Sequence, residues 1–263
     1  NQNKRRFSMT KDEHRSTARV LSILSTLSSE KEGLTLAELS QRLQAPKSSL
    51  FPIVHTMADQ NFIFYNEASQ KHTIGLNSYL VGISYMNRHN VFERIKDEMK
   101  TIVQQCSEIC QFGILEHDLV LYLAKVDSPE PVRLASDIGK RLPAYCTSLG
   151  KALLSRLSME DLRELYPKPL APFTENTVKN LEELSQQLLN VRETSIALEQ
   201  GETHPDISCI AVPLLRNQQV AASISVSVPT FRFTPEKREQ IETLLLRAKP
   251  KLEKLLEQNE QIQ

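Results

Sequence analysis

The chain has 263 residues, a length that suits two domains, and its hydrophobic content of 40% can support ordinary buried cores. No apolar run approaches the roughly 20 residues of a membrane-spanning helix, and the N-terminus lacks the apolar segment of a signal peptide. The composition therefore predicts a cytoplasmic protein without a membrane partner, and the net charge of zero taken alone argues against nucleic acid.

The zero net charge hides an uneven distribution along the chain. Residues 1–88 carry 11 Lys and Arg against 7 Asp and Glu, whereas the remaining residues carry 21 against 25. Positive residues are densest in residues 1–13, which predicts a basic flexible arm that seeks DNA phosphates. The alternative is a disordered tail that only improves solubility.

Three helices are predicted after this arm. Apolar residues at helical spacing indicate a first helix over 16–28. Thr35 and Glu38 have the spacing of a capping box, so a second helix is predicted over 36–43. A short turn then leads to a third helix over 48–59. Two helices joined by so short a turn are typical of a helix-turn-helix, whose second helix enters the major groove of DNA.

A β-hairpin follows the third helix, because residues 62–65 and 72–74 are short strands around a polar turn. The order predicts a winged helix-turn-helix over residues 14–75, followed by a linker helix over 76–90. Double-stranded operator DNA is the expected partner, and the hairpin is expected to reach a backbone phosphate or the minor groove. The expected DNA-binding residues are Thr35, Lys47, Ser48, Ser49, Phe51, His55, Lys71 and His72.

Pro52 complicates the third helix. Proline removes one backbone donor and restricts the preceding residue, here Phe51. We therefore expect the helix to begin late, at Ser48 or Ser49, or to bend.

Residues 91–263 mix helices and strands. The predicted helices cover residues 91–109, 148–157, 158–165 and 181–193, and a last helix follows Thr234. The predicted strands cover residues 112–115, 119–126, 209–215 and 220–228, with a possible strand over 132–136. Helices placed between an early and a late hairpin indicate an α+β domain on one antiparallel sheet.

Three helix boundaries in this part carry specific expectations. Ser158 and Thr234 are expected to cap the helices that follow them, and Thr177 is a candidate cap for a helix from Val178 onward. Pro250 is expected to kink or split the last helix.

The sequence contains few residue patterns that indicate a metal site, a cofactor site or a catalytic site. The four cysteines lack paired C-x-x-C spacing, the six histidines lack metal-binding spacing, and seven glycines disfavour a dinucleotide site. Ser148 and Lys151 match the S-x-x-K pattern of serine acyl-enzymes, but no S-D-N or K-T-G pattern accompanies them. We expect no metal and no cofactor, and treat a serine hydrolase as the weaker alternative to a regulator.

From about residue 14 to residue 256 the sequence resembles IclR-type transcriptional regulators. Four segments carry the resemblance together: LAELSQRLQAPKSSLF, DSPEPVRLASDIGKRLPAYCTSLGKALL, ISCIAVPLL and ASISVSVP. The resemblance implies a winged helix, a linker helix through which subunits dimerise, and a GAF-like effector-binding domain. It also implies binding to palindromic operators as a homodimer or tetramer, switched by a small metabolite such as a carboxylate or sugar acid.

The same resemblance implies an effector pocket within residues 91–263. Gly150 and Ala152 would offer backbone N–H groups at a helix start, a favourable place for a carboxylate. Ser225 and Ser227 alternate with apolar residues and so point to one face of a strand. The expected effector-binding residues are Ala144, Thr147, Gly150, Ala152, Glu199, Cys209, Ser225 and Ser227.

Several positions depart from the family pattern. Ala144 and Tyr145 stand where the family commonly has a bulky aliphatic residue and a histidine, which implies a differently shaped pocket. Glu199 replaces the usual aspartate. Pro52 stands where the recognition helix usually carries arginine, so a sensor or scaffold that does not bind DNA stays open as a further alternative.

Overall fold

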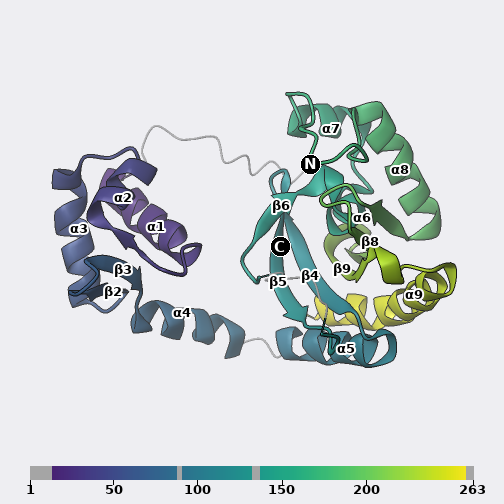
Figure 1. The fold of residues 1–263 in the computed structure, drawn as a ribbon, viewed down its shortest axis with the longest axis horizontal. Coiled ribbons are helices and arrows are strands. Elements are labelled where there is room, and N and C mark those ends of the chain that lie inside the picture. Colours follow the sequence, from purple (N-terminus) through teal and green to yellow (C-terminus); the bar gives the residue numbers. More distant parts are fainter. Residues whose placement is uncertain (1–13, 88–90, 132–136, 259–263) are drawn as a thin grey trace. The chain divides into compact units, whose positions relative to one another are not determined.

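The computed structural model describes residues 14–87, 91–131 and 137–258. The chain divides into two compact units, Asn1–Arg88 and His89–Gln263 (Figure 1). The predicted basic arm over 1–13 and the possible strand over 132–136 lie outside the described residues.

The first unit is a winged helix-turn-helix followed by a further helix. Its elements are α1 (Arg15–Ser28), β1 (Leu34–Thr35), α2 (Leu36–Arg42), α3 (Lys47–Asp59), β2 (Ile63–Asn66), β3 (Lys71–Ile74) and α4 (Leu76–Asn87). The strands form an antiparallel sheet in the order β1-β3-β2. The three predicted helices and the hairpin are confirmed, whereas β1 was not predicted because two residues are too short to show a period.

A small apolar core holds this unit together. Ile23 of α1, Leu39 of α2, Leu50 of α3 and Ile63 of β2 are almost completely buried in one cluster. Full burial of such a side chain contributes roughly 1.5–3 kcal/mol to the stability of the folded state. The core therefore fixes α3 and the wing relative to the other two helices.

Helix α3 does not begin late. It starts at Lys47, directly after Pro46, and continues through Pro52 to Asp59. Pro52 lacks the N–H that would bond the Ser48 carbonyl four residues earlier, yet the helix continues through it, and both residues are exposed to solvent. The Thr56 hydroxyl donates to the Pro52 carbonyl at 2.8 Å, within the same stretch of helix. The expectation of a start at Ser48 or Ser49 is therefore wrong.

The second unit is built on one six-stranded antiparallel sheet in the order β6-β5-β4-β9-β8-β7. Its strands are β4 (Ile109–Glu116), β5 (Leu119–Val126), β6 (Arg141–Pro143), β7 (Ala197–Gln200), β8 (Ile207–Arg216) and β9 (Gln219–Pro229). Its helices are α5 (Val91–Cys106), α6 (Ser148–Leu154), α7 (Met159–Leu165), α8 (Leu181–Thr194) and α9 (Pro235–Glu257), with single turns η1 (Ala144–Cys146) and η2 (Thr230–Arg232). The α+β fold class is confirmed.

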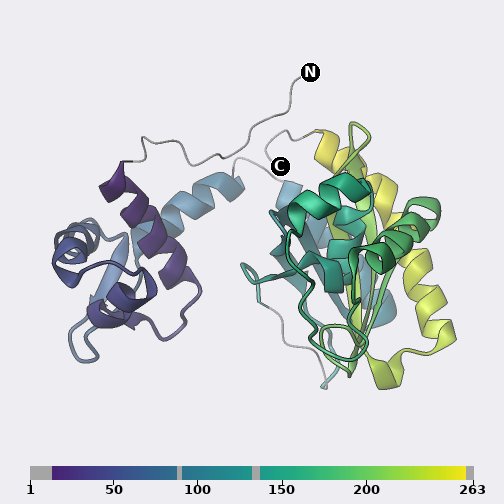
Figure 2. The ribbon, with the colours of Figure 1, turned by 90° about the horizontal axis from the view of Figure 1, so that it is seen from above.

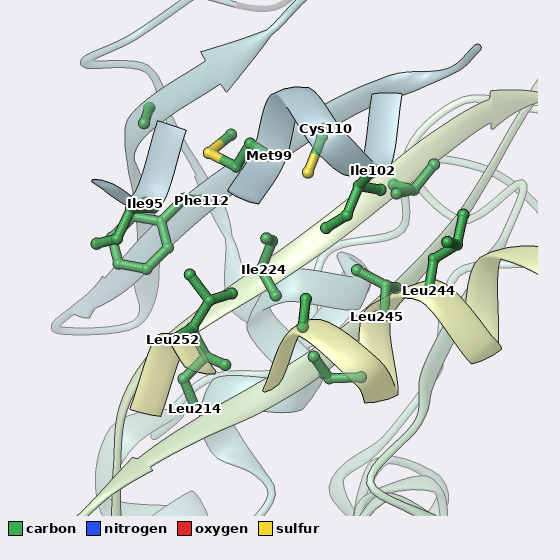
Figure 3. Packing of buried hydrophobic residues seen from close by; sticks show 14 of the residues in the cluster. Ile95, Met99, Ile102, Cys110, Phe112, Leu214, Ile224, Leu244, Leu245 and Leu252 are labelled. Carbon is green, nitrogen blue, oxygen red and sulfur yellow. The ribbon is translucent and has the colours of Figure 1, made fainter. Parts of the chain in front are cut away.

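Helices cover both faces of this sheet (Figures 1 and 2). On one face α5 and α9 pack against the strands, with Met99, Phe112, Ile224 and Leu252 among the buried side chains (Figure 3). On the other face α6, α8 and η1 form a second core. Among the described residues, no helix is long and apolar enough to span a membrane.

Helices α5 and α6 end at Cys106 and Leu154, before the predicted ends at 109 and 157. The expected cap of α8 is wrong, and of the two outcomes expected at Pro250 the split does not occur. Asn180, not Thr177, caps α8; the Thr177 hydroxyl instead accepts the Phe173 amide at 3.0 Å and donates to the Glu202 carbonyl at 2.7 Å. Helix α9 is not split at Pro250, because buried residues on both sides of it pack into the same core. The caps at Ser158 and Thr234 are confirmed.

The short edge strands β6 and β7 were not predicted. They have three and four residues and pair only on one side, so neither carries a clear apolar alternation.

Candidate functional site

A groove of about 550 Å³ lies between α2, α3 and the hairpin of the first unit. It brings together five of the eight residues predicted to contact DNA. These are Thr35, Lys47, Phe51, His55 and His72.

The first turn of α3 presents its side chains to solvent. Lys47 and Ser48 are exposed, and Phe51 is 59% exposed one turn later. A large exposed aromatic beside a lysine at a helix start suits contact with a base edge and a phosphate. The Ser49 hydroxyl, by contrast, donates to the Pro46 carbonyl at 2.7 Å.

Two other predicted residues of this face have local partners. The Thr35 hydroxyl closes the capping box by accepting the Glu38 amide at 3.2 Å. His55 Nδ1 lies 3.0 Å from the Asp59 carboxylate on the exposed side of α3. The protein itself therefore orients both side chains before any partner arrives.

His72 is placed differently from the prediction. It is only 8% exposed, its Nδ1 lies 3.3 Å from the Leu34 carbonyl, and its ring packs 4.8 Å from that of Tyr65. Burial lowers the pKa of His72, which favours the neutral ring. The imidazole thus joins β3 to β1 instead of reaching out from the wing, while its neighbour Lys71 is half-buried.

The second unit contains a cavity of about 280 Å³ over the face of the sheet that carries α6. Strands β4, β5, β8 and β9 supply its floor, and its walls come from β6, β7, η1, α6 and the loops that carry Phe173 and Thr203. The lining residues are Gln111, Tyr122, Lys140, Leu142, Pro143, Cys146, Thr147, Ser148, Phe173, Glu199, Thr203, His204, Ile207, Cys209, Ser225 and Ser227.

Strand register places the polar groups of the floor side by side. Ser227 pairs with Cys209 across β8 and β9, and Ser225 pairs with Gln111 across β4 and β9. The Cys209 thiol donates to the Ser227 hydroxyl at 3.0 Å, which donates to Gln111 Oε1 at 2.9 Å. Among the described residues the Ser225 hydroxyl has no protein partner, so it is available to a ligand.

Glu199 places a carboxyl group in the wall of this cavity. It is 1% exposed, and its Oε1 accepts the backbone N–H groups of Glu202 and Thr203. Burial raises the pKa of Glu199 although these hydrogen bonds and the Cys209 thiol act to lower it. Burial also raises the pKa of Cys209 well above its ordinary value.

Five of the predicted effector residues line the cavity and three do not. Thr147, Glu199, Cys209, Ser225 and Ser227 line it, whereas Ala144, Gly150 and Ala152 are buried behind it.

Gly150 was expected to offer a backbone N–H to an effector carboxylate, and its surroundings show why it does not line the cavity. Its N–H is already taken by the Thr147 hydroxyl at 3.0 Å, and its Cα packs directly on η1. A Cβ at Gly150 would lie 2.0 Å from the Ala144 carbonyl oxygen. Gly150 therefore serves close packing, and its amide is not a free donor for a carboxylate.

Several other lining residues were not among those predicted from the sequence. Gln111 and Tyr122 interrupt otherwise apolar strands, a signal that could have marked them. Lys140 and His204 lie in loops, where no periodic pattern identifies a cavity wall.

Comparison with known proteins decides the family. Residues 83–253 match the family model described as bacterial transcriptional regulator IclR C-terminal, and residues 16–67 match the IclR helix-turn-helix domain. The chain belongs to the IclR family. It is a transcriptional regulator with a helix-turn-helix DNA-binding domain and an IclR C-terminal effector domain.

Relatives of known name and structure agree with this membership. The HTH-type transcriptional regulator KdgR of Escherichia coli (strain K12) is 29% identical over 239 residues, covering 90% of each chain. The IclR regulator of Alicyclobacillus acidocaldarius has the same fold, with a TM-score of 0.85 at 23% identity over 93% of this chain and 99% of that one. An IclR homologue from Microbacterium hydrocarbonoxydans, complexed with 4-hydroxybenzoate, has a TM-score of 0.81 at 23% identity over 93% and 100%.

The hydrolase alternative finds no support in this IclR-family protein. Lys151 forms a buried ion pair with Glu202 and also donates to the Leu198 carbonyl at 3.4 Å. Its ammonium group is therefore engaged away from Ser148, and the relatives are named transcriptional regulators, not enzymes.

Proposed function

We propose that this regulator binds a palindromic operator as a homodimer or tetramer, and that an organic acid in the cavity of the second unit switches it. The observation that carries the effector assignment is the polar floor of the cavity, where the Ser225 hydroxyl has no partner among the described residues.

Donors around the cavity support an acid as the ligand. Gln111 accepts a hydrogen bond through Oε1, which leaves its Nε2 as a donor, and Lys140 and His204 stand in the wall. Burial raises the pKa of Glu199, which favours the neutral carboxyl beside a bound acid. The structural neighbour complexed with 4-hydroxybenzoate, itself a carboxylate, supports the same class of ligand.

A population shift is the proposed mechanism. Helix α4 exposes Leu76, Tyr79, Leu80 and Val81, an apolar face suited to the pairing of subunits. A ligand that prefers one arrangement of the paired chains changes the spacing of their two α3 helices. Because operator half-sites have a strict spacing, such a change alters DNA affinity.

A thermal-shift screen of small carboxylates and sugar acids tests the effector assignment. An acid that binds the native state raises the melting temperature, because binding stabilises only the folded protein. Absence of a shift with every acid, combined with a shift by neutral or cationic compounds, would remove the organic acid from the proposal.

The DNA assignment predicts that Lys47→Ala weakens binding to the regulator's own promoter region. Loss of one phosphate contact should lower the slope of log affinity against log salt by about one unit. Fluorescence anisotropy at several salt concentrations measures this slope. Lys168→Ala, which removes an exposed lysine of the second unit, serves as the control and should leave the slope unchanged. Equal slopes for Lys47→Ala and the unmodified protein would contradict the placement of Lys47.

The effector assignment predicts that Ser225→Ala weakens binding of the acid found in the screen by about five- to tenfold, the value of one lost hydrogen bond. Operator affinity without ligand should not change. Ser223→Ala is the matched control, because the Ser223 hydroxyl donates to the Leu149 carbonyl at 3.1 Å and does not line the cavity. An identical calorimetric titration of Ser225→Ala and the unmodified protein would remove Ser225 from the site.

A further inference from the structure

Glu202 connects three parts of the second unit although it does not line the cavity. Its backbone N–H donates to the Glu199 carboxylate, and its carbonyl accepts the Thr177 hydroxyl at 2.7 Å. Its side chain forms the ion pair with Lys151 of α6. One residue thus holds β7, the segment before α8, and α6 together.

Each of these partners belongs to a segment that does line the cavity. Lys151 follows Ser148 by one helical turn, and Thr177 accepts the amide of Phe173. On the other side, Glu202 is followed directly by Thr203. The contacts of Glu202 therefore join the walls of the cavity from behind.

The ion pair itself is buried. The side chains of Lys151 and Glu202 are 1% and 8% exposed. Burial raises the pKa of Glu202, an effect that the charge of Lys151 opposes. Oε2 of Glu202 still forms no hydrogen bond, the one such buried side-chain oxygen or nitrogen within the described ranges.

A buried pair of this kind is sensitive to loss of one partner. Removal of either side chain leaves an uncompensated charge in a medium of low dielectric, whereas removal of both charges is far better tolerated. The pair costs desolvation, so stability alone is a weak reason for its presence.

We propose that Lys151 and Glu202 are positioning residues for the effector cavity: their ion pair holds the loop over 201–204 against α6 and thereby sets the shape of the cavity. Neither residue touches the ligand. The proposal rests on the proposed function only for the nature of that ligand.

The test uses two readouts that require no effector. Hydrogen exchange followed by mass spectrometry reports the protection of the amides of residues 201–204. Alkylation of Cys209 by iodoacetamide, located by peptide mapping, reports access to the cavity. Cys209 is partly exposed, whereas Cys146, which also lines the cavity, is buried, as are Cys106 and Cys110. In Lys151→Met and in Glu202→Gln we expect both rates to rise about tenfold, because the loop then opens by local unfolding.

Glu108→Gln is the matched control. Glu108 is 2% exposed and pairs with Arg232 at 2.7 Å, and it does not line the cavity. It should lower the melting temperature without changing exchange in residues 201–204 or alkylation of Cys209.

The double variant Lys151→Met/Glu202→Gln distinguishes an effect on the position of the loop from an effect on the stability of the protein, because it contains no unpaired buried charge. It is also the variant to measure if a single variant does not fold. We expect its melting temperature to recover toward that of the unmodified protein while the loop still exchanges fast. Loop exchange and alkylation at the unmodified rates in the single variants, or equal increases in Glu108→Gln, would overturn the proposal. If no acid binds the protein, the proposed function fails, and these two readouts still decide the positioning role.

Discussion

Replacement of Gly150 by alanine is expected to lower the free energy of unfolding of the second unit by about 3 kcal/mol, at the upper end for overpacked sites. The added Cβ would lie 2.0 Å from the Ala144 carbonyl oxygen and 2.3 Å from the Ala144 Cα. Both are backbone atoms, which cannot turn away as a flexible side chain would. Helix α6 must therefore move away from η1, and Thr147 and Ser148 in the cavity wall move with it.

Chemical denaturation followed by circular dichroism measures this change. Gly82→Ala is the control, because a Cβ there meets no atom within 4 Å and alanine favours the exposed helix α4 by up to about 1 kcal/mol. A loss below about 0.5 kcal/mol in Gly150→Ala, the range of ordinary surface substitutions, would show that the contact between α6 and η1 can relax.

Glu199→Gln is expected to remove a pH dependence from both stability and effector binding. The folded state raises the pKa of Glu199 above its ordinary value of 4.5, because the ionised carboxylate is buried. Its contribution to stability is complete below the pKa of the unfolded chain and is lost as the pH rises through the folded pKa. Because one proton is involved, the free energy of unfolding falls by at most about 1.4 kcal/mol per pH unit in that window. Glutamine, which is never ionised, does not show this fall.

The affinity for an acid should also decrease as the pH rises. A carboxylate beside Glu199 favours the protonated form, so the affinity of the unmodified protein should fall as the pH rises, by up to about tenfold per pH unit. The remaining titratable groups in the cavity lining are Tyr122, Lys140, Cys146, His204 and Cys209. Glu202 lies directly behind Glu199, and burial raises its pKa as well, so it contributes to the pH dependence of stability with the same sign.

Calorimetric titrations at pH 5 and pH 8, with denaturation curves at the same values, measure both effects. Glu160→Gln removes an exposed carboxylate and should keep the pH dependence of the unmodified protein. A Glu199→Gln variant with that same pH dependence would mean that another group of the cavity is responsible.

Features that depend on neighbours in the chain could be predicted from the sequence. Thr35 with Glu38 and Ser158 with Asp161 form capping boxes across three residues, and helices follow both. The alternation around Ser225 and Ser227 likewise placed both side chains on the cavity face of β9. In these cases the residues whose spacing is read from the sequence are the same residues that form the hydrogen bonds or share the strand face in the folded protein.

The tertiary structure alone decided which of the predicted groups are free to act. Gly150 and His72 have suitable chemistry in suitable positions, but Thr147 occupies the amide of one and the Leu34 carbonyl lies against the ring of the other. The pairing of Lys151 with Glu202 joins residues 51 positions apart in the chain. Periodicity shows which face of an element is apolar; it does not show which polar group already has a partner, because that partner comes from a distant segment brought near by packing.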